Sequence, residues 1–245
     1  MNRLQSELQR LYLLEDSSAA GAAPTLINAQ GQVRALVLEL AHTVPWERIA
    51  GLWHQIQEDW NLPPPALAIS GSDSFQLWFS LAVPVPLAQA LAVLQSLRQR
   101  YASGLAPAQW RTWPTAQPQH APLVPAQQQG SGHWSAFIVP GLGSMFTEEP
   151  WLERAPSPEA QADLLQLLHS VTPAAWQGLL QQAQATAAPV ATTPQATTDA
   201  QCMGAYDFLH SVMNDPAAPL HLRIEAAKAL LPYSSKPASP VSSAP

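Results

Sequence analysis

Charged residues and cysteine are both scarce in this sequence. Only 11% of its 245 residues are Asp, Glu, Lys or Arg, against roughly 25% in an average soluble protein. The formal net charge of −6 excludes a protein that coats nucleic acid through overall positive charge. The single cysteine, Cys202, excludes an intramolecular disulfide and a zinc site built from several cysteines. Any contact with nucleic acid must therefore be local.

Long apolar runs and cofactor motifs are missing too. No uncharged apolar run approaches the roughly 18 residues that span a bilayer, and Arg3, Glu7 and Arg10 interrupt the leucines where a signal peptide would be continuous. We therefore expect a soluble protein of the cytoplasm with no membrane partner. The histidines form no HxH or HxxxH pair and no phosphate-binding loop occurs, so we predict no metal site and no cofactor.

Proline is abundant instead, with 25 residues, and its distribution divides the chain. Residues 184–203 are mostly Ala, Thr, Pro and Gln, a composition that cannot build a core, so we predict a flexible linker there. The linker separates a domain over 1–183 from a helical hairpin over 204–233, whose two helices are broken at Asp215-Pro216. We expect a disordered tail over 234–245.

The apolar pattern of residues 1–183 alternates between helical and strand spacing. Helices are predicted over 4–14, 45–60, 87–101, 158–170 and 173–183, and strands over 33–40, 66–70, 75–83, 109–114 and 134–140. The prolines of the fourth strand flank its apolar residues, which is typical of an edge strand. The sequence therefore predicts an α+β (α/β) domain, a mixed sheet with flanking helices.

One long stretch of this domain is free of acidic side chains. No Asp or Glu occurs between Asp73 and Glu148, although several arginines and aromatic residues do. Arginine contacts phosphates and flat aromatic rings stack on bases, which is how single-stranded nucleic acid is held. The candidate nucleic-acid-binding residues are Arg98, Arg100, Trp110, Arg111 and Trp113. The alternative is an ordinary helix face with core tryptophans.

Glu39 is unusual because it lies within an apolar predicted strand. Burying a carboxylate is costly unless it has a partner. Glu39 is therefore either the remnant of a site or a glutamate at the end of a strand that reaches solvent or an arginine.

The stretch from Val33 to Arg100 resembles the catalytic half of the archaeo-eukaryotic primase superfamily. The resemblance lies in a strand ending in an acidic motif, a helix, a turn of small residues, and a strand beginning with Ser-x-His. The acidic motif of that family, Asp-x-Asp, falls on Glu39-Leu40-Ala41, and Ser-x-His falls on Ser74-Phe75-Gln76. The family's third carboxylate has no counterpart near Pro140-Gly141.

The resemblance implies a primase-like fold whose catalytic motifs are degenerate. Family members hold two divalent metals with their carboxylates and bind the nucleotide with the histidine. This chain keeps one carboxylate and has glutamine in place of histidine, so we predict no catalytic residue. The remnant candidates are Glu39, Ser74 and Gln76.

The segment YDFLHSVMNDPAAPLHLRIEAAKALLPY, residues 206–233, is similar to a stretch of small terminase-subunit-like phage proteins. Its second helix places Leu222, Ala226 and Leu230 on one apolar face. A hairpin this small cannot bury enough surface by itself. We expect residues 204–233 to pack on a protein partner, on a second copy of the chain, or on the main domain.

These observations predict a non-catalytic protein of phage or prophage origin that binds nucleic acid, or a partner, in replication or packaging. Single-stranded nucleic acid is the expected ligand. The main alternative is a protein-protein adaptor that never contacts nucleic acid, which the acidic net charge favours. An active primase or nucleotidyltransferase would require Asp73 or Glu148 to lie beside Glu39.

Overall fold

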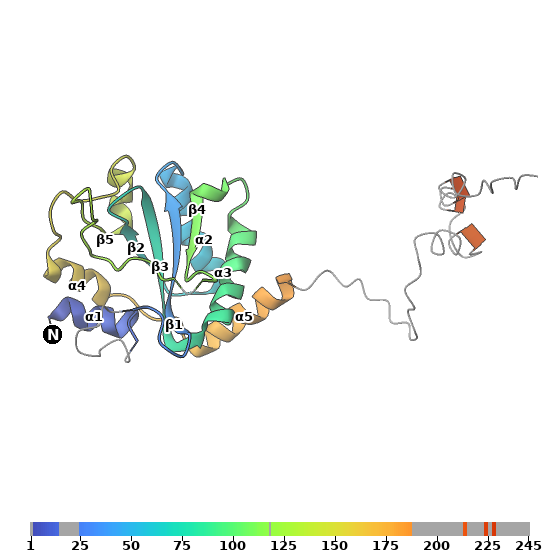
Figure 1. Ribbon diagram of the computed structural model, residues 1–245, viewed down its shortest axis with the longest axis horizontal. Helices are drawn as coiled ribbons and strands as arrows, with labels where there is room; N and C mark the ends of the chain where they lie inside the picture. Colours follow the sequence, from blue (N-terminus) through green and yellow to red (C-terminus); the bar gives the residue numbers. More distant parts are fainter. Residues whose placement is uncertain are drawn as a thin grey trace, which may run out of the picture. The chain divides into compact units, whose positions relative to one another are not determined.

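The computed structural model of the chain describes residues 2–14, 25–117 and 119–187, together with three helical pairs at 213–214, 223–224 and 227–228. The chain divides into two units, residues 1–190 and residues 191–245, and Figure 1 labels the helices and strands of the first. Most of the predicted linker, the remainder of the predicted hairpin and the predicted tail lie outside the described residues. All named helices and strands belong to the first unit.

The first unit is built on one sheet with the strand order β4-β1-β3-β2-β5. Its elements in chain order are β1 (Gln32–Ala41), α2 (Trp46–Trp60), β2 (Ala66–Ile69), β3 (Ser74–Pro86), α3 (Leu87–Tyr101), β4 (Trp110–Trp113) and β5 (Ala136–Ile138). The first six follow the β-α-β-β-α-β order of the split βαβ, or ferredoxin-like, arrangement. The predicted α+β class is therefore confirmed.

The pairing of the strands differs in one respect from the predicted mixed sheet. The four pairings of the described sheet are all antiparallel, and a parallel contact occurs at the isolated bridge between Leu81 and Val171. Antiparallel pairing follows from the connections. Helix α2 joins β1 to β2, and α3 joins β3 to β4, and in each case the two joined strands are two places apart in the sheet. The strand between them runs in the opposite direction, so each hydrogen-bonded pair is antiparallel.

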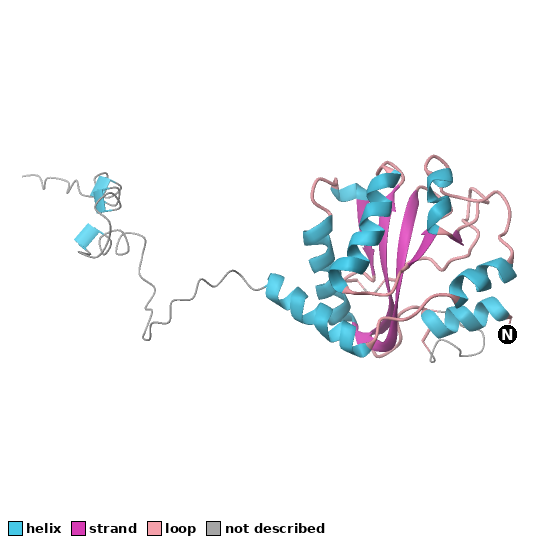
Figure 2. Ribbon diagram, turned by 180° about the vertical axis from the view of Figure 1, so that it is seen from behind, coloured by secondary structure: helices cyan, strands magenta, loops and turns pink. Residues whose placement is uncertain are grey.

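Helices cover both faces of the sheet (Figure 2). Because side chains alternate along a strand, Leu36, Leu38 and Leu40 of β1 share one face. They pack there against α2, α3 and α5 (Pro173–Ala187) in the larger core cluster. In α2, apolar residues at intervals of three and four positions face this core, and the helix ends at Asn61 in the left-handed conformation.

The opposite face is covered by α1 (Arg3–Leu11) and α4 (Pro158–Gln166). The ring of Tyr12, which follows α1, lies 5.3 Å from Trp78 and 6.1 Å from Phe137 between ring centroids. Arg10 donates to the carbonyl of Leu165 at 2.8 Å, which fixes α1 against the end of α4. The helix predicted over 4–14 therefore packs on its own domain.

Several segment ends differ from the predictions, among them those of β5, α4 and α5. The strand predicted over 134–140 stops at Ile138, because Pro140 cannot continue a ladder and begins the 3-10 helix η3 (Pro140–Phe146). Helix α4 ends at Gln166 rather than at 170. Helix α5 continues to Ala187, four residues into the segment predicted as linker, because alanine and glutamine are good helix formers.

Gly143 tests the packing of η3 against α2. A Cβ atom at Gly143 would lie 1.9 Å from the indole of Trp46, whereas at Gly141 it would meet no atom within 4 Å. We therefore expect Gly143→Ala to lower the free energy of unfolding by about 2 kcal/mol through overpacking. Gly141→Ala should change it by less than about 0.5 kcal/mol. Urea unfolding followed by circular dichroism measures both, and equal effects would contradict this packing.

Candidate functional site

The two motif positions of the primase resemblance meet at one end of the sheet. Glu39 of β1 lies opposite Gln76 of β3 and also opposite Arg111 of β4. All three side chains share the face covered by α1 and α4, because strand residues alternate between faces. Antiparallel pairing thus brings Glu39 beside Ser74 and Gln76, which are 35 and 37 residues away in sequence.

The Glu39 carboxylate is buried and accepts three hydrogen bonds from neutral donors. The Ser74 hydroxyl donates to Oε1 at 3.0 Å, the Gln76 amide to Oε2 at 3.4 Å, and the Trp113 indole to Oε2 at 2.9 Å. Glu39 is 7% exposed, and Ser74 and Gln76 are also buried. We call these four residues, together with Arg111, the Glu39 cluster.

Trp78 fixes the orientation of the Gln76 amide. Its indole N–H donates to Gln76 Oε1 at 3.0 Å, so the amide nitrogen of Gln76 points to Glu39. Arg111 supplies the countercharge, with Nη1 3.6 Å from Glu39 Oε1. The cost of burying this carboxylate is therefore offset by donors on β3 and β4 and by one arginine. Glu39 has the arginine partner that the sequence offered as one alternative.

The residues present do not fit a pair of catalytic metal ions. Two-metal catalysis requires carboxylates that bind both ions, whereas Ala41 and Gln76 stand at the other motif positions. Asp73 lies in the turn before β3, where its carboxylate accepts from the Ser72 hydroxyl at 3.2 Å. Within the described residues, no group of three His, Cys, Asp or Glu side chains could hold a metal ion.

The five predicted nucleic-acid-binding residues do not form one surface. Trp110 lies in the core on the α2 and α3 face, is 2% exposed, and has an indole N–H without a hydrogen-bond partner among the described residues. It cannot stack on a base in the folded protein. Arg111 and Trp113 face the other way, and the Arg111 side chain is 54% exposed. Only these two of the five belong to the Glu39 cluster.

Arg98 and Arg100 lie in the last turn of α3, on the helix layer opposite the Glu39 cluster. Arg98 is exposed. Arg100 forms an ion pair with Asp59 at 2.9 Å and lies over the rings of Trp60 and Tyr101. Burial, aided by a hydrogen bond from its hydroxyl to Asp59, raises the pKa of Tyr101 to about 12. Because Asp59 lies on α2, its ion pair with Arg100 joins α2 to α3.

Sequence reasoning missed the role of Trp113 as a hydrogen-bond donor to Glu39. A usable signal was present, because Arg111 and Trp113 are two residues apart and therefore share one face of a predicted edge strand. The sequence did not reveal that β4 pairs with β1, which depends on the order of strands in the sheet.

Comparison with known proteins adds no family: no protein-family model matches the chain, and no curated protein matches its sequence. The primase-like and terminase-like resemblances therefore stay predictions. Across the described ranges, no helix is both long and apolar enough to cross a membrane.

Removing the Glu39 carboxylate should destabilise the sheet end. We expect Glu39→Ala to lower the free energy of unfolding by about 3 kcal/mol, because it leaves the buried donors of Ser74 and Gln76 and the partly buried indole N–H of Trp113 without their acceptor. The control is Glu153→Ala, at an exposed glutamate. Urea unfolding measures both, and a loss below about 1 kcal/mol for Glu39→Ala would show that the cluster is not structural.

Proposed function

We propose that this is a non-catalytic binding protein of phage or prophage origin with a primase-like domain that does not transfer nucleotides. The observation that carries the proposal is the saturation of Glu39 by Ser74, Gln76 and Trp113. A metal ion at this carboxylate would have to displace neutral hydrogen bonds in a buried position. No neighbouring carboxylate of the cluster would help to bind it.

Gln76 occupies the position that the resemblance gives to a nucleotide-binding histidine. Its amide oxygen is taken by Trp78 and its amide nitrogen by Glu39. Unlike a histidine, an amide does not gain or lose a proton near neutral pH, and in Gln76 both polar atoms already make contacts within the protein. The former motif positions therefore serve to hold β1 and β3 together.

Single-stranded nucleic acid is the proposed ligand, and the β4 edge is the proposed contact. Arg111 is half exposed and Trp113 is partly exposed on the same face of this edge strand. The stretch between Asp73 and Glu148 that carries them has no acidic residue. An arginine beside an aromatic ring suits a phosphate and its base. Because the two residues form a small site, binding should be weak.

A protein adaptor is the second candidate function. Two of the three arginines of the acid-free stretch are paired with acids, Arg100 with Asp59 and Arg111 with Glu39. Pairing lowers the local positive potential that nucleic acid requires. Met145 and Leu167 are 75% and 72% exposed, which is unusual for large apolar side chains.

Nucleotidyl transfer should be absent. The purified protein, supplied with Mg²⁺ or Mn²⁺, a primed or unprimed template and nucleotides, is expected to incorporate no nucleotide, because the cluster offers one saturated carboxylate. Incorporation is measured with labelled nucleotides on denaturing gels. Template-dependent incorporation that disappears in Glu39→Ala, with folding checked by circular dichroism, would overturn the non-catalytic proposal.

Nucleic-acid binding should depend on salt and on Arg111. We expect Arg111→Ala to reduce the log–log salt slope for a single-stranded oligonucleotide by up to roughly 0.7, because one phosphate contact releases about that many counterions. Arg98→Ala, at an exposed arginine on the opposite layer, is the matched control and should leave the slope unchanged. Fluorescence anisotropy at several salt concentrations measures the slope. If the wild-type protein binds no oligonucleotide at low salt, the adaptor function replaces this proposal.

A further inference from the structure

An apolar groove runs beside α2 and shares no lining residue with the Glu39 cluster. It consists of two neighbouring cavities of about 280 and about 350 Å³. Both are lined by Trp53, Leu67 and Pro140, so the two cavities adjoin each other in one depression. Trp46 lines one end and the leucines of the last turn of α4, including Leu164, line the other. We call this depression the α2–β5 groove.

Exposed apolar side chains gather at the same place. Six large apolar side chains are exposed among the described residues. Two of them, Val139 and Leu167, line the first cavity. Leu142 and Met145 lie on η3, whose first residue, Pro140, lines both cavities. Apolar surface gathered in this way is typical of a protein contact site rather than of scattered exposed residues.

The edge of the sheet beside the groove is closed to strand addition. The side-chain amide of Gln161 pairs with both backbone groups of Phe137 in β5, accepting from its N–H at 2.8 Å and donating to its carbonyl at 2.9 Å. A neighbouring strand would use these same two groups. Gln161 is 5% exposed and therefore fixed by its surroundings. A segment that enters the groove must be recognised through its side chains, which favours a helix over a strand.

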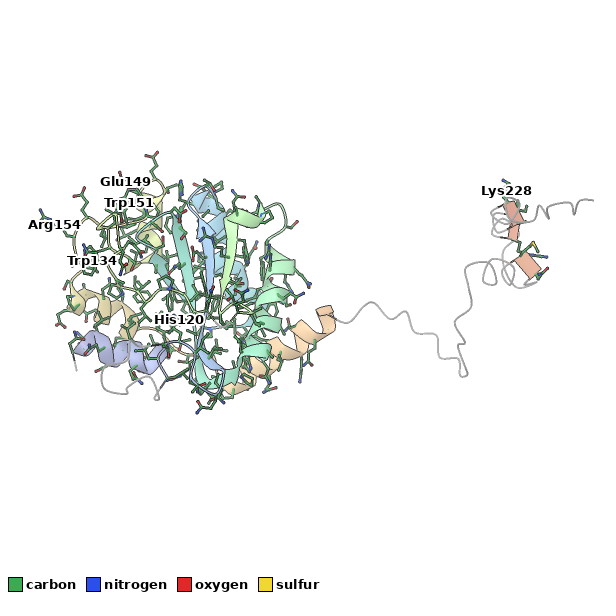
Figure 3. The ribbon with its side chains drawn as sticks, viewed as in Figure 1. His120, Trp134, Glu149, Trp151, Arg154 and Lys228 are labelled. Atoms are coloured by element: carbon green, nitrogen blue, oxygen red, sulfur yellow. The ribbon has the colours of Figure 1, made fainter. Side chains whose placement is uncertain are left out.

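The charges around the groove are unequal at its two ends. Neither cavity, as far as the described residues go, is lined by Asp, Glu, Lys or Arg. At the Trp46 end, Glu148 and Glu149 follow η3, whose Gly143 contacts the Trp46 ring, whereas Glu47 lines a different cavity together with Arg48. Glu148 and Glu149 are exposed, and Figure 3 shows Glu149 on the outer surface of the domain.

Arg48 does not neutralise these glutamates. Its guanidinium donates to the carbonyl of Ser103, in the loop after α3, which lies on another side of α2. The Trp46 end of the groove is therefore acidic, and the α4 end carries no charged lining residue.

We propose that the α2–β5 groove binds an amphipathic helix of a partner protein, with its apolar face in the groove and a cluster of Lys or Arg at the end beside Trp46. This inference does not depend on the nucleic-acid proposal, because the groove and Arg111 share no residue. A second copy of this chain is a poorer occupant, because it would bring its own glutamates, and a net charge of −6, to an acidic site.

The test uses a synthetic helical peptide with leucines on one face and lysines at one end. We expect it to bind the full chain, and Leu167→Asp to weaken binding at least roughly tenfold, because a charge in the apolar contact must lose its water. Leu167 is 72% exposed, so the variant should fold. Val83→Asp is the matched control, since Val83 is an exposed apolar residue on β3 that does not line the groove. It should bind within about twofold of wild type.

Charge substitutions test whether the lysines of the peptide contact the acidic end of the groove. Changing both Glu148 and Glu149 to lysine should weaken the lysine peptide about fivefold at low salt, and a peptide with glutamates in place of lysines should bind more weakly than the original. Isothermal titration calorimetry measures these affinities.

Equal binding by Leu167→Asp and wild type, or equal binding of the two peptides, would overturn the proposal. So would a dimer of the wild-type chain that Leu167→Asp dissociates. Unchanged oligonucleotide binding in Leu167→Asp keeps the two proposals separate.

Discussion

The arrangement of the sheet depends on how a buried carboxylate is satisfied. Glu39 lies between β3 and β4, and its oxygens accept from Ser74, Gln76 and Trp113. These donors come from both neighbouring strands, so the register of β1 with each of them is fixed by polar contacts as well as by apolar packing. A shift of β1 by one residue would put the Glu39 side chain on the face opposite its donors. The buried carboxylate therefore favours one register of β1 with its neighbouring strands. It lies at the position where the primase resemblance predicts a catalytic residue.

The same alternation decides which surfaces remain for binding. On one face of β4, Trp110 packs in the core with α2 and α3. On the other face, the Arg111 side chain is exposed at the sheet edge. The opposite edge, β5, is occupied by Gln161 and carries the apolar groove instead. The two edges therefore differ in chemistry: one offers an arginine beside an aromatic ring, and the other offers apolar side chains with glutamates at one end.

Local sequence signals predicted most of this architecture, and contacts distant in sequence account for the remainder. Helical spacing of apolar residues located α2, and apolar runs with strand spacing located β1 and β3. The sequence also singled out Glu39 as needing a partner. It did not show that Trp110 is buried, because the face taken by an edge strand depends on its register with β1. The role of Gln161 was equally hidden, because a glutamine in a helix carries no signal for a strand 24 residues earlier.

Because its oxygens are held by protein donors, Glu39 should not bind a divalent ion. Electron paramagnetic resonance of free Mn²⁺, titrated against the wild-type chain and against Glu39→Gln, measures this, because glutamine keeps the shape but loses the charge that a hard cation requires. We expect the same Mn²⁺ uptake for both proteins. A Mn²⁺ site present in the wild-type chain and lost in Glu39→Gln would show that the carboxylate is free to bind metal.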